Sequence, residues 1–414
     1  MTESNHNLEM PKNEIKNNKL IEKVKIAANY CYNCNRCLLV CPLSHVGLFS
    51  PRDLINDVSS MDLDEAVSNN DIWSCLTCGQ CTIYCPMTKE NTGVQIPQLI
   101  LELRKIYTND ISQHEKIKAC ETHDNITTLV TEIMADSPIP PDKLDFIKNA
   151  GLEVKESGEI ALFIGCLPLM EDMIYNFKVD YLANPKSVIG MLNAAGIVPV
   201  VLNEKCCGHD ILWGKGDEET FKKLAEYNVN LYKKVGVKKI IFSCAEGYRT
   251  WKFDYPKYIK NFDFEIYHFT EFFIKEGILD HLRFPPESKI KVTYHDACRL
   301  GRLGGKIYDA PREILRSLPG IELVEMANIR DDANCCGVSA FTGCNEYSRI
   351  IRKNRIQEAI DTGAEYLVVP CPKCLTHFTC YLTEPALDQT QLDMRDKIKV
   401  IDLASFMGKL LFLI

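Results

Sequence analysis

One arrangement of cysteines occurs twice near the amino-terminal end, and it constrains the fold more than any other feature. Four cysteines with gaps of two, two and three residues, followed directly by proline, occupy residues 31–41 and again residues 75–85. Gaps of two residues let a tight loop direct three thiolates at one metal cluster, whereas the fourth cysteine points away. In two-cluster ferredoxins this fourth cysteine binds the other cluster. The sequence therefore predicts two [4Fe–4S] clusters that exchange their fourth ligands.

The exchange assigns every cysteine of the two runs to one cluster. Cluster 1 takes Cys31, Cys34, Cys37 and Cys85, and cluster 2 takes Cys75, Cys78, Cys81 and Cys41. Two zinc knots are the alternative, because four thiolates also suit zinc, but the doubled pattern favours iron and sulfide. The spacer between the runs is longer than a minimal ferredoxin needs. We therefore expect helices in it, and a helical ferredoxin domain over residues 19–105.

Composition limits the cellular location and the binding partners that we expect. The 414 residues include 20 cysteines, whereas disulfide scaffolds belong to small secreted chains. Residues 1–18 are polar, carry no signal segment and are expected to be flexible, and no apolar run is long enough to span a membrane. The net charge is −8 without a basic block, so no nucleic-acid partner is expected. We expect a cytoplasmic protein, associated with a membrane only peripherally, through a partner subunit.

The second half of the chain repeats itself. A strand that ends in cysteine, a Cys-Cys-Gly triplet and another strand that ends in cysteine recur about 130 residues apart, at Cys166 and Cys298, at 206–208 and 335–337, and at Cys244 and Cys371. Short β-branched segments alternate with helical stretches in both copies, which indicates α/β layers with largely parallel sheets. We predict a helical linker over residues 106–157 and two tandem, pseudo-symmetric α/β cysteine-rich domains over 158–285 and 286–414. The fold class is α+β for the whole chain and α/β for the copies.

The two copies differ by one cysteine. The second copy has a five-cysteine site, more than one tetrahedral zinc or one ordinary cubane uses, made of Cys298, Cys335, Cys336, Cys371 and Cys374. The first-copy site has four, Cys166, Cys206, Cys207 and Cys244, because Gly247 stands where the second copy has Cys374. Zinc, a [4Fe–4S] cluster and a cluster with one iron open to substrate sulfur are alternatives there. Three cysteines without partners at ligand spacing are expected to be inert: Cys120, Cys344 and Cys380.

Paired four-cysteine runs followed by two such domains resemble the catalytic iron–sulfur subunit of heterodisulfide reductase, and its D-type most. The strings HDACRLGR at 295–302 and PCPKC at 370–374 carry the resemblance, which spans residues 19–414. The amino-terminal part is similar to the helical ferredoxin module of fumarate reductases. The resemblance implies reduction of the coenzyme M–coenzyme B mixed disulfide of methanogenic archaea at non-cubane [4Fe–4S] clusters on the Cys-Cys-Gly cysteines. It also implies an electron-donor subunit, either a membrane b-type cytochrome or a flavoprotein.

Disulfide cleavage takes two electrons, which cubanes deliver singly, so the five-cysteine site is expected to hold a half-reduced sulfur species. Arg299, Arg302 and Lys306 follow Cys298 and are candidates to bind an anionic substrate, with a solvated basic face as the alternative. His209 and His295 stand beside motif cysteines and are candidate proton donors to a leaving thiolate. The other interpretation of both histidines is a hydrogen bond to cluster sulfur or to backbone.

A second function fits the same motifs. The chain also resembles the electron-transfer iron–sulfur subunits of 2-hydroxy-acid and anaerobic glycerol-3-phosphate dehydrogenases, which have no substrate of their own. No flavin or nicotinamide fingerprint is present in the sequence. The one glycine-rich candidate, GRLGG, does not have the glycine spacing of a dinucleotide-binding loop. A separate donor is therefore needed under both interpretations. The fifth cysteine of the second copy favours catalysis, since simple electron relay does not require it.

Overall fold

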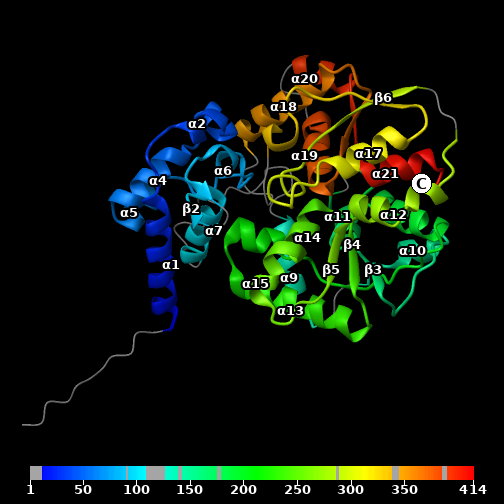
Figure 1. The fold of residues 1–414 in the computed structure, drawn as a ribbon, viewed down its shortest axis with the longest axis horizontal. Coiled ribbons are helices and arrows are strands. Elements are labelled where there is room, and N and C mark those ends of the chain that lie inside the picture. Colours follow the sequence, from blue (N-terminus) through cyan, green and yellow to red (C-terminus); the bar gives the residue numbers. More distant parts are fainter. Residues whose placement is uncertain are drawn as a thin grey trace, which may run out of the picture.

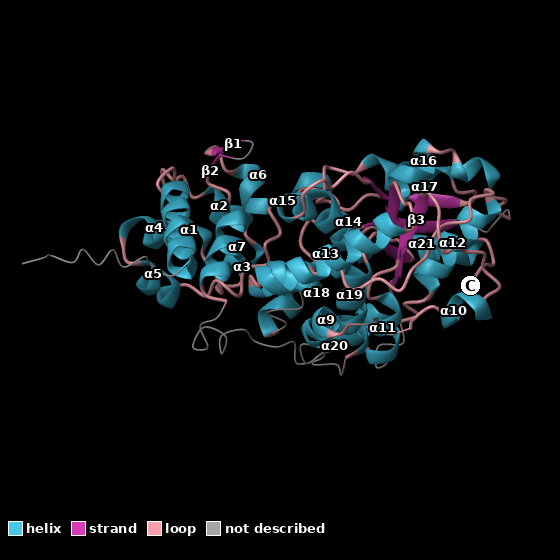
Figure 2. Cartoon of the chain, turned by 90° about the horizontal axis from the view of Figure 1, so that it is seen from below, coloured by secondary structure: helices cyan, strands magenta, loops and turns pink. Residues whose placement is uncertain are grey.

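The computed structural model describes residues 12–89, 92–108, 126–138, 142–174, 179–285, 289–337, 345–384 and 389–414. A helical domain lies at one end of an elongated molecule, and two α/β copies lie together at the other (Figures 1 and 2). Cys120 and Cys344, which we expected to be inert thiols, lie outside the described residues. Within the described ranges, no helix is both long and apolar enough to cross a membrane.

The amino-terminal domain is built from short helices around the two cysteine runs. They are α1 (Lys12–Ala28), α2 (Arg36–Val40), α3 (Pro42–His45), α4 (Pro51–Ser60), α5 (Leu63–Asn69), α6 (Gln80–Tyr84) and α7 (Ile96–Ile106), with a hairpin of β1 (Thr88–Lys89) and β2 (Thr92–Gly93). Helix α1 begins at Lys12, inside the segment 1–18 that we expected to be flexible. As expected, helices fill the spacer between the runs. Helix α4 begins there at a Ser50 cap and buries Leu54 and Val58.

The first copy has a three-stranded parallel sheet in the order β3 (Ile160–Phe163), β4 (Lys239–Phe242), β5 (Glu265–His268). Beside β3, Val200 forms an isolated parallel bridge with Ala161 and not a full strand. The helices of this copy are α11 (Leu167–Met173), α12 (Ala183–Ala194), α13 (Glu218–Lys234), α14 (Ala245–Arg249), α15 (Tyr255–Tyr258) and α16 (Phe269–Lys275). Helices α9 (Ile126–Asp136) and α10 (Asp145–Asn149) precede the sheet, inside the predicted linker.

The second copy repeats this arrangement. Its parallel sheet has the order β7 (Ile321–Leu323), β6 (Ile290–Tyr294), β8 (Tyr366–Val369), β9 (Lys399–Asp402), and its helices are α17 (Asp309–Ser317), α18 (Glu346–Ile360), α19 (Pro372–Thr383), α20 (Gln389–Arg395) and α21 (Leu403–Leu410). Strands β3, β4 and β5 correspond in order to β6, β8 and β9. The predicted pair of pseudo-symmetric α/β domains is confirmed.

The copies pack through matched helices, so they are related by an approximate twofold axis. Helix α12 packs on α21, and their counterparts α17 and α16 pack on each other. Apolar side chains of these four helices share one core with one face of both sheets. Strand residues alternate between cores, since Leu162 faces this one whereas Phe163 faces the core that extends into the amino-terminal domain. The carboxyl ends of the strands, where the cysteines follow, therefore meet between the copies.

Arg104, on α7, joins the amino-terminal domain to the first copy. Its guanidinium group is fully buried and donates hydrogen bonds to the carbonyls of Ile72 (2.8 Å), Trp73 (3.0 Å) and Cys75 (2.9 Å). The same group donates to the carbonyl of Trp213 in the first copy. The carbonyls of Ile72, Trp73 and Cys75 belong to irregular backbone, where no helix or strand supplies them with a donor, whereas the Trp213 carbonyl belongs to a short π-helix, Ile211–Lys215.

We predict that Arg104→Ala lowers the stability of the folded chain by about 3 kcal/mol, because it leaves several buried carbonyls without a donor. The midpoint of urea unfolding, followed by tryptophan fluorescence under anaerobic conditions, measures the effect. Arg283→Ala is the control, since Arg283 is exposed and, among the residues that the structure describes, donates only to the nearby Asp280 carbonyl. Equal midpoints for the two variants would contradict the role given to Arg104.

Candidate cysteine and metal sites

Both amino-terminal cysteine runs have the same unusual backbone. In the first run Asn33 and Asn35 have φ angles of 61° and 64°, and at the matching positions of the second run Thr77 and Gly79 have φ angles of 45° and 80°. A left-handed residue after the first cysteine and another after the second turn each loop tightly, and such a turn suits three thiols that face one cluster. A Cβ on Gly79 would lie 2.9 Å from the Leu303 side chain of the second copy, so a larger residue would have to displace that side chain and also adopt a left-handed φ.

The exchanged sets of cysteines lie together in space. The Cys37 thiol has a pKa raised to about 11, by burial first and then by Cys31, Cys34 and Cys85 beside it. The pKa of Cys81 is raised well above its usual value, by burial and then by Cys78, Cys75 and Cys41. Thiols so close together cannot all ionise without a cation among them, and iron supplies that charge. The donor sets fit the two predicted [4Fe–4S] clusters, and the ligand assignment stays a prediction.

The two sets differ in their access to solvent. Cys34 is exposed, whereas Cys41, Cys75, Cys78 and Cys81 are all buried. Cluster 1 would therefore lie near the surface of the helical domain and cluster 2 inside the molecule.

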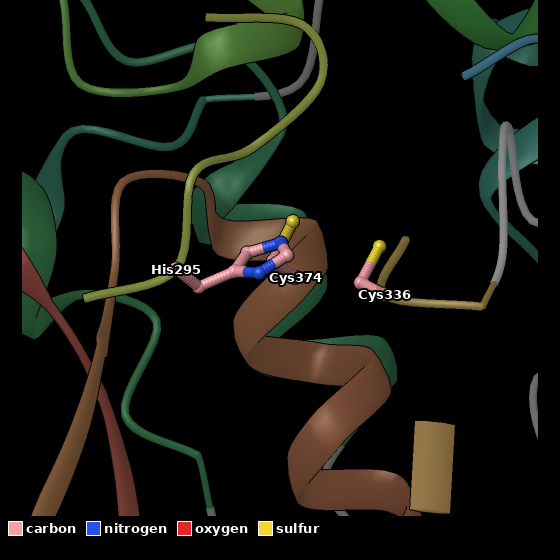
Figure 3. A group of neighbouring side chains, drawn as sticks. All are labelled: His295, Cys336 and Cys374. Atoms are coloured by element: carbon pink, nitrogen blue, oxygen red, sulfur yellow. The ribbon is translucent and has the colours of Figure 1, made fainter. Parts of the chain in front are cut away.

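The five-cysteine site gathers at the carboxyl ends of β6 and β8. Cys335 lies next to Cys336, Cys336 next to Cys374, and Cys374 next to Cys371. Gly337 has a φ of 91°, and its N–H donates to the Cys335 sulfur at 3.4 Å, which is the turn expected after the paired cysteines. His295 joins the group, because its ring nitrogen and the sulfurs of Cys336 and Cys374 lie within 4.8 Å of one another (Figure 3).

The first-copy site is less complete. Cys166 and Cys206 are neighbours, and Cys206 is next to Cys207. The thioether sulfur of Met170 lies 3.9 Å from the Cys166 sulfur, and the Thr131 hydroxyl donates to the Cys206 sulfur at 3.5 Å. Residues from α9 and α11 thus enclose these three cysteines.

Two contacts join the sites into one series. Cys78, assigned to cluster 2, lies next to Cys335 of the five-cysteine site. Cys244 of the first copy lies next to Cys371. Neighbouring sulfurs therefore lead from the helical domain through the second copy to the first.

The arginines that we considered as substrate contacts bind protein instead. Arg299 is buried and donates to the Thr77 carbonyl at 2.8 Å, to the Thr77 hydroxyl at 2.7 Å and to His209 Nε2 at 3.1 Å. Arg302 donates to the carbonyls of Cys78 (3.0 Å) and Ala333 (2.7 Å). These hydrogen bonds occupy N–H groups that an anionic substrate would need. The expectation that Arg299 and Arg302 clamp an anion is therefore corrected, because the two side chains join the amino-terminal domain to the second copy. Lys306 is exposed and lies 3.5 Å from the Asp331 carboxylate.

Both candidate histidines are buried and uncharged. Burial and then Arg355 lower the pKa of His295 to about 3, and burial and then Arg299 lower the pKa of His209 well below its usual value. Arg355 donates to His295 Nδ1 at 3.2 Å, which leaves the Nε2 proton on the other side of the ring. His295 can therefore give an N–H to a cysteine or cluster sulfur. His209 bonds with Arg299 and, at 3.0 Å, with the Thr250 hydroxyl.

The sequence did not lead us to expect a cluster of ion pairs between the copies. Buried Lys373 forms ion pairs with Asp210 and, at 2.7 Å, with Glu246 of the first copy. Burial raises the pKa of Glu246 to about 7, and Lys373 opposes that shift. A signal was present, since Glu246 and Lys373 each stand two residues after matching cysteines and carry opposite charges.

Comparison with known proteins agrees with this geometry. The family model described as a cysteine-rich domain (CCG) matches residues 160–248 and 292–379, and a 4Fe-4S dicluster domain matches residues 27–88. The chain is therefore an iron–sulfur protein that joins a 4Fe-4S dicluster domain to two cysteine-rich domains.

The relatives of the chain indicate which iron–sulfur proteins it is similar to. The chain is 26% identical, over 88% of its length and 91% of the relative, to the D-type subunit of dihydromethanophenazine:CoB–CoM heterodisulfide reductase from Methanosarcina barkeri. It is 26% identical to an uncharacterized iron–sulfur protein of Methanococcus maripaludis, over 92% of this chain and 72% of the relative. It is also 27% identical to EtfAB:quinone oxidoreductase of Syntrophomonas wolfei, over 86% of this chain and 48% of that protein. The resemblance to the D-type subunit of heterodisulfide reductase is confirmed, within a wider group of iron–sulfur oxidoreductases.

We predict that Cys85→Ser damages cluster 1, although Cys85 belongs to the second run, because its thiol neighbours those of the first. Electron paramagnetic resonance (EPR) of the reduced chain and its iron content measure the loss. Cys41→Ser is the matched variant and should damage cluster 2 instead. Spectra in which each serine removes the cluster of its own run would contradict the exchange.

Proposed function

We propose that the chain is an oxidoreductase that reduces a small-molecule disulfide at the five-cysteine site. One observation carries the proposal: Cys78 of the dicluster domain lies next to Cys335, so the site of proposed chemistry adjoins the proposed electron relay. The fifth thiol supports catalysis as well, because a cubane uses only four.

Electrons would enter at cluster 1, near exposed Cys34, and pass through cluster 2. Two one-electron transfers and two protons convert one disulfide into two thiols. A non-cubane [4Fe–4S] cluster, when bound to the five cysteines, would supply iron that can bind substrate sulfur. The protein's own groups would orient and enclose the site. A ring nitrogen of His295 lies beside the Cys336 and Cys374 sulfurs, and Arg302 fixes the backbone on both sides of the Cys78–Cys335 contact.

Similarity to the D-type subunit of heterodisulfide reductase makes the coenzyme M–coenzyme B disulfide the first substrate to test. It also supports an electron-donor subunit, either a membrane b-type cytochrome or a flavoprotein, and a cytoplasmic chain held at the membrane by that partner. A further cluster or a zinc ion would occupy the first-copy site.

Electron relay without a substrate is the second candidate, and the relative named EtfAB:quinone oxidoreductase favours it. In this role the chain would pass electrons from a flavoprotein toward quinone, as an iron–sulfur subunit of a 2-hydroxy-acid or glycerol-3-phosphate dehydrogenase complex would.

An anaerobic EPR titration of the iron-loaded chain separates the two candidates. We expect a new paramagnetic signal that appears only when the chain is oxidised in the presence of coenzyme M or coenzyme B thiol, because substrate sulfur then binds cluster iron. Spectra that are unchanged by either thiol would support electron relay.

We predict that Cys374→Ala abolishes disulfide reduction with reduced viologen as donor and leaves the EPR signals of both amino-terminal clusters intact. Cys374 lies between Cys336 and Cys371, so the substitution removes the thiol that connects these two cysteines. The control is Cys380→Ala, which removes another buried cysteine from the same helix, α19. Turnover that persists in Cys374→Ala would move the chemistry elsewhere.

A further inference from the structure

Two matching cysteines meet where the copies meet. Cys244 follows β4 and Cys371 follows β8, and these strands are counterparts in the duplicated fold. The two thiols are direct neighbours. Counterparts can be in contact only at the axis that relates the copies, so Cys244 lies on the boundary between the two sites.

Gly247 weakens the link between Cys244 and its own site, although Cys207 of that site still lies near Cys244. In the second copy Cys374 contacts both Cys336 and Cys371 and so connects the Cys-Cys-Gly loop to the strand end. Gly247 provides no sulfur at that position. A Cβ there would lie 3.2 Å from the Phe242 ring, so the aromatic side chain occupies the space next to it. The bridging thiol that would join Cys207 to Cys244 is thus missing.

An ion pair fixes the contact. Glu246 and Lys373 stand two residues after Cys244 and Cys371, and they pair across the boundary at 2.7 Å. Asp210, three residues after Cys207, also pairs with Lys373. All three side chains are buried, so the pairs act where water screens them least. The ion pairs hold the start of α14 against the start of α19. They therefore also hold Cys244 next to Cys371.

We propose that Cys244 of the first copy is a ligand of the second copy's cluster. The reactive site would then draw six thiolates from both copies, and the first-copy site would keep Cys166, Cys206 and Cys207. Three thiolates suit one metal ion such as zinc, with its fourth position open, better than a four-iron cluster. The inference rests on the proposed function only in taking the five-cysteine site as a cluster site.

The test is a serine substitution in two backgrounds of the iron-loaded chain. The Cys166→Ala/Cys206→Ala background empties the first-copy site. Adding Cys244→Ser to it should lower the iron content further and change the EPR signal of the second site. The Cys336→Ala/Cys374→Ala background empties the second site, and there Cys244→Ser should release no metal from the first. The reverse pattern, with metal lost only in the second background, would overturn the proposal. Unchanged amino-terminal cluster signals show that each variant is folded.

Differential alkylation of the wild-type chain gives an answer without any substitution. Cys166, Cys207 and Cys244 have comparable partial exposure, so iodoacetamide can reach each of them once its metal is gone. After a chelator removes the first-site ion, mass spectrometry should find Cys166 and Cys207 labelled and Cys244 protected together with Cys371. Labelling of Cys244 together with Cys207 would overturn the proposal. Neither experiment measures disulfide reduction, so a chain that only relays electrons can still satisfy both.

Discussion

Buried and partly buried guanidinium groups hold the cysteine loops in place, and the rest of the site depends on them. The loops that present thiols are irregular, so their carbonyls need donors from outside. Arg104 serves the backbone around Cys75, and Arg299 and Arg302 serve Thr77 and Cys78. The same cations face the sulfurs: burial raises the pKa of Cys298, and Arg299 and Arg302 oppose it. One set of side chains thus satisfies the backbone, joins the domains and offsets the negative charge of gathered thiolates.

Local spacing made much of the site predictable. The gaps within each cysteine run, the repeat and the strand-then-cysteine pattern are all short-range, and the structure gathers the cysteines largely as those patterns imply. Contacts between copies were not predictable in this way. Nothing near Cys244 in the sequence indicates that its neighbour is Cys371, because that contact follows from how the two sheets face each other.

The arginines show why residue type alone misleads. Cations just after Cys298 suggested an anionic substrate, but a guanidinium group binds carbonyl oxygens as readily as carboxylates. Burial decides between the two roles, and exposure cannot be read from the string HDACRLGR. The ligand assignments, the linker and the domain boundaries given from the sequence stay predictions.

The opposite charges of Glu246 and Lys373 have a consequence for how such a chain can assemble. If the first copy paired with another first copy across the same axis, two glutamates would be buried against each other, and two second copies would bury two lysines. Like charges at a buried contact are strongly unfavourable, so this face rejects both symmetric pairings. Each first copy therefore packs favourably only on a second copy. The second copy is also the one to which it is covalently linked, so charge and chain connectivity favour the same pairing.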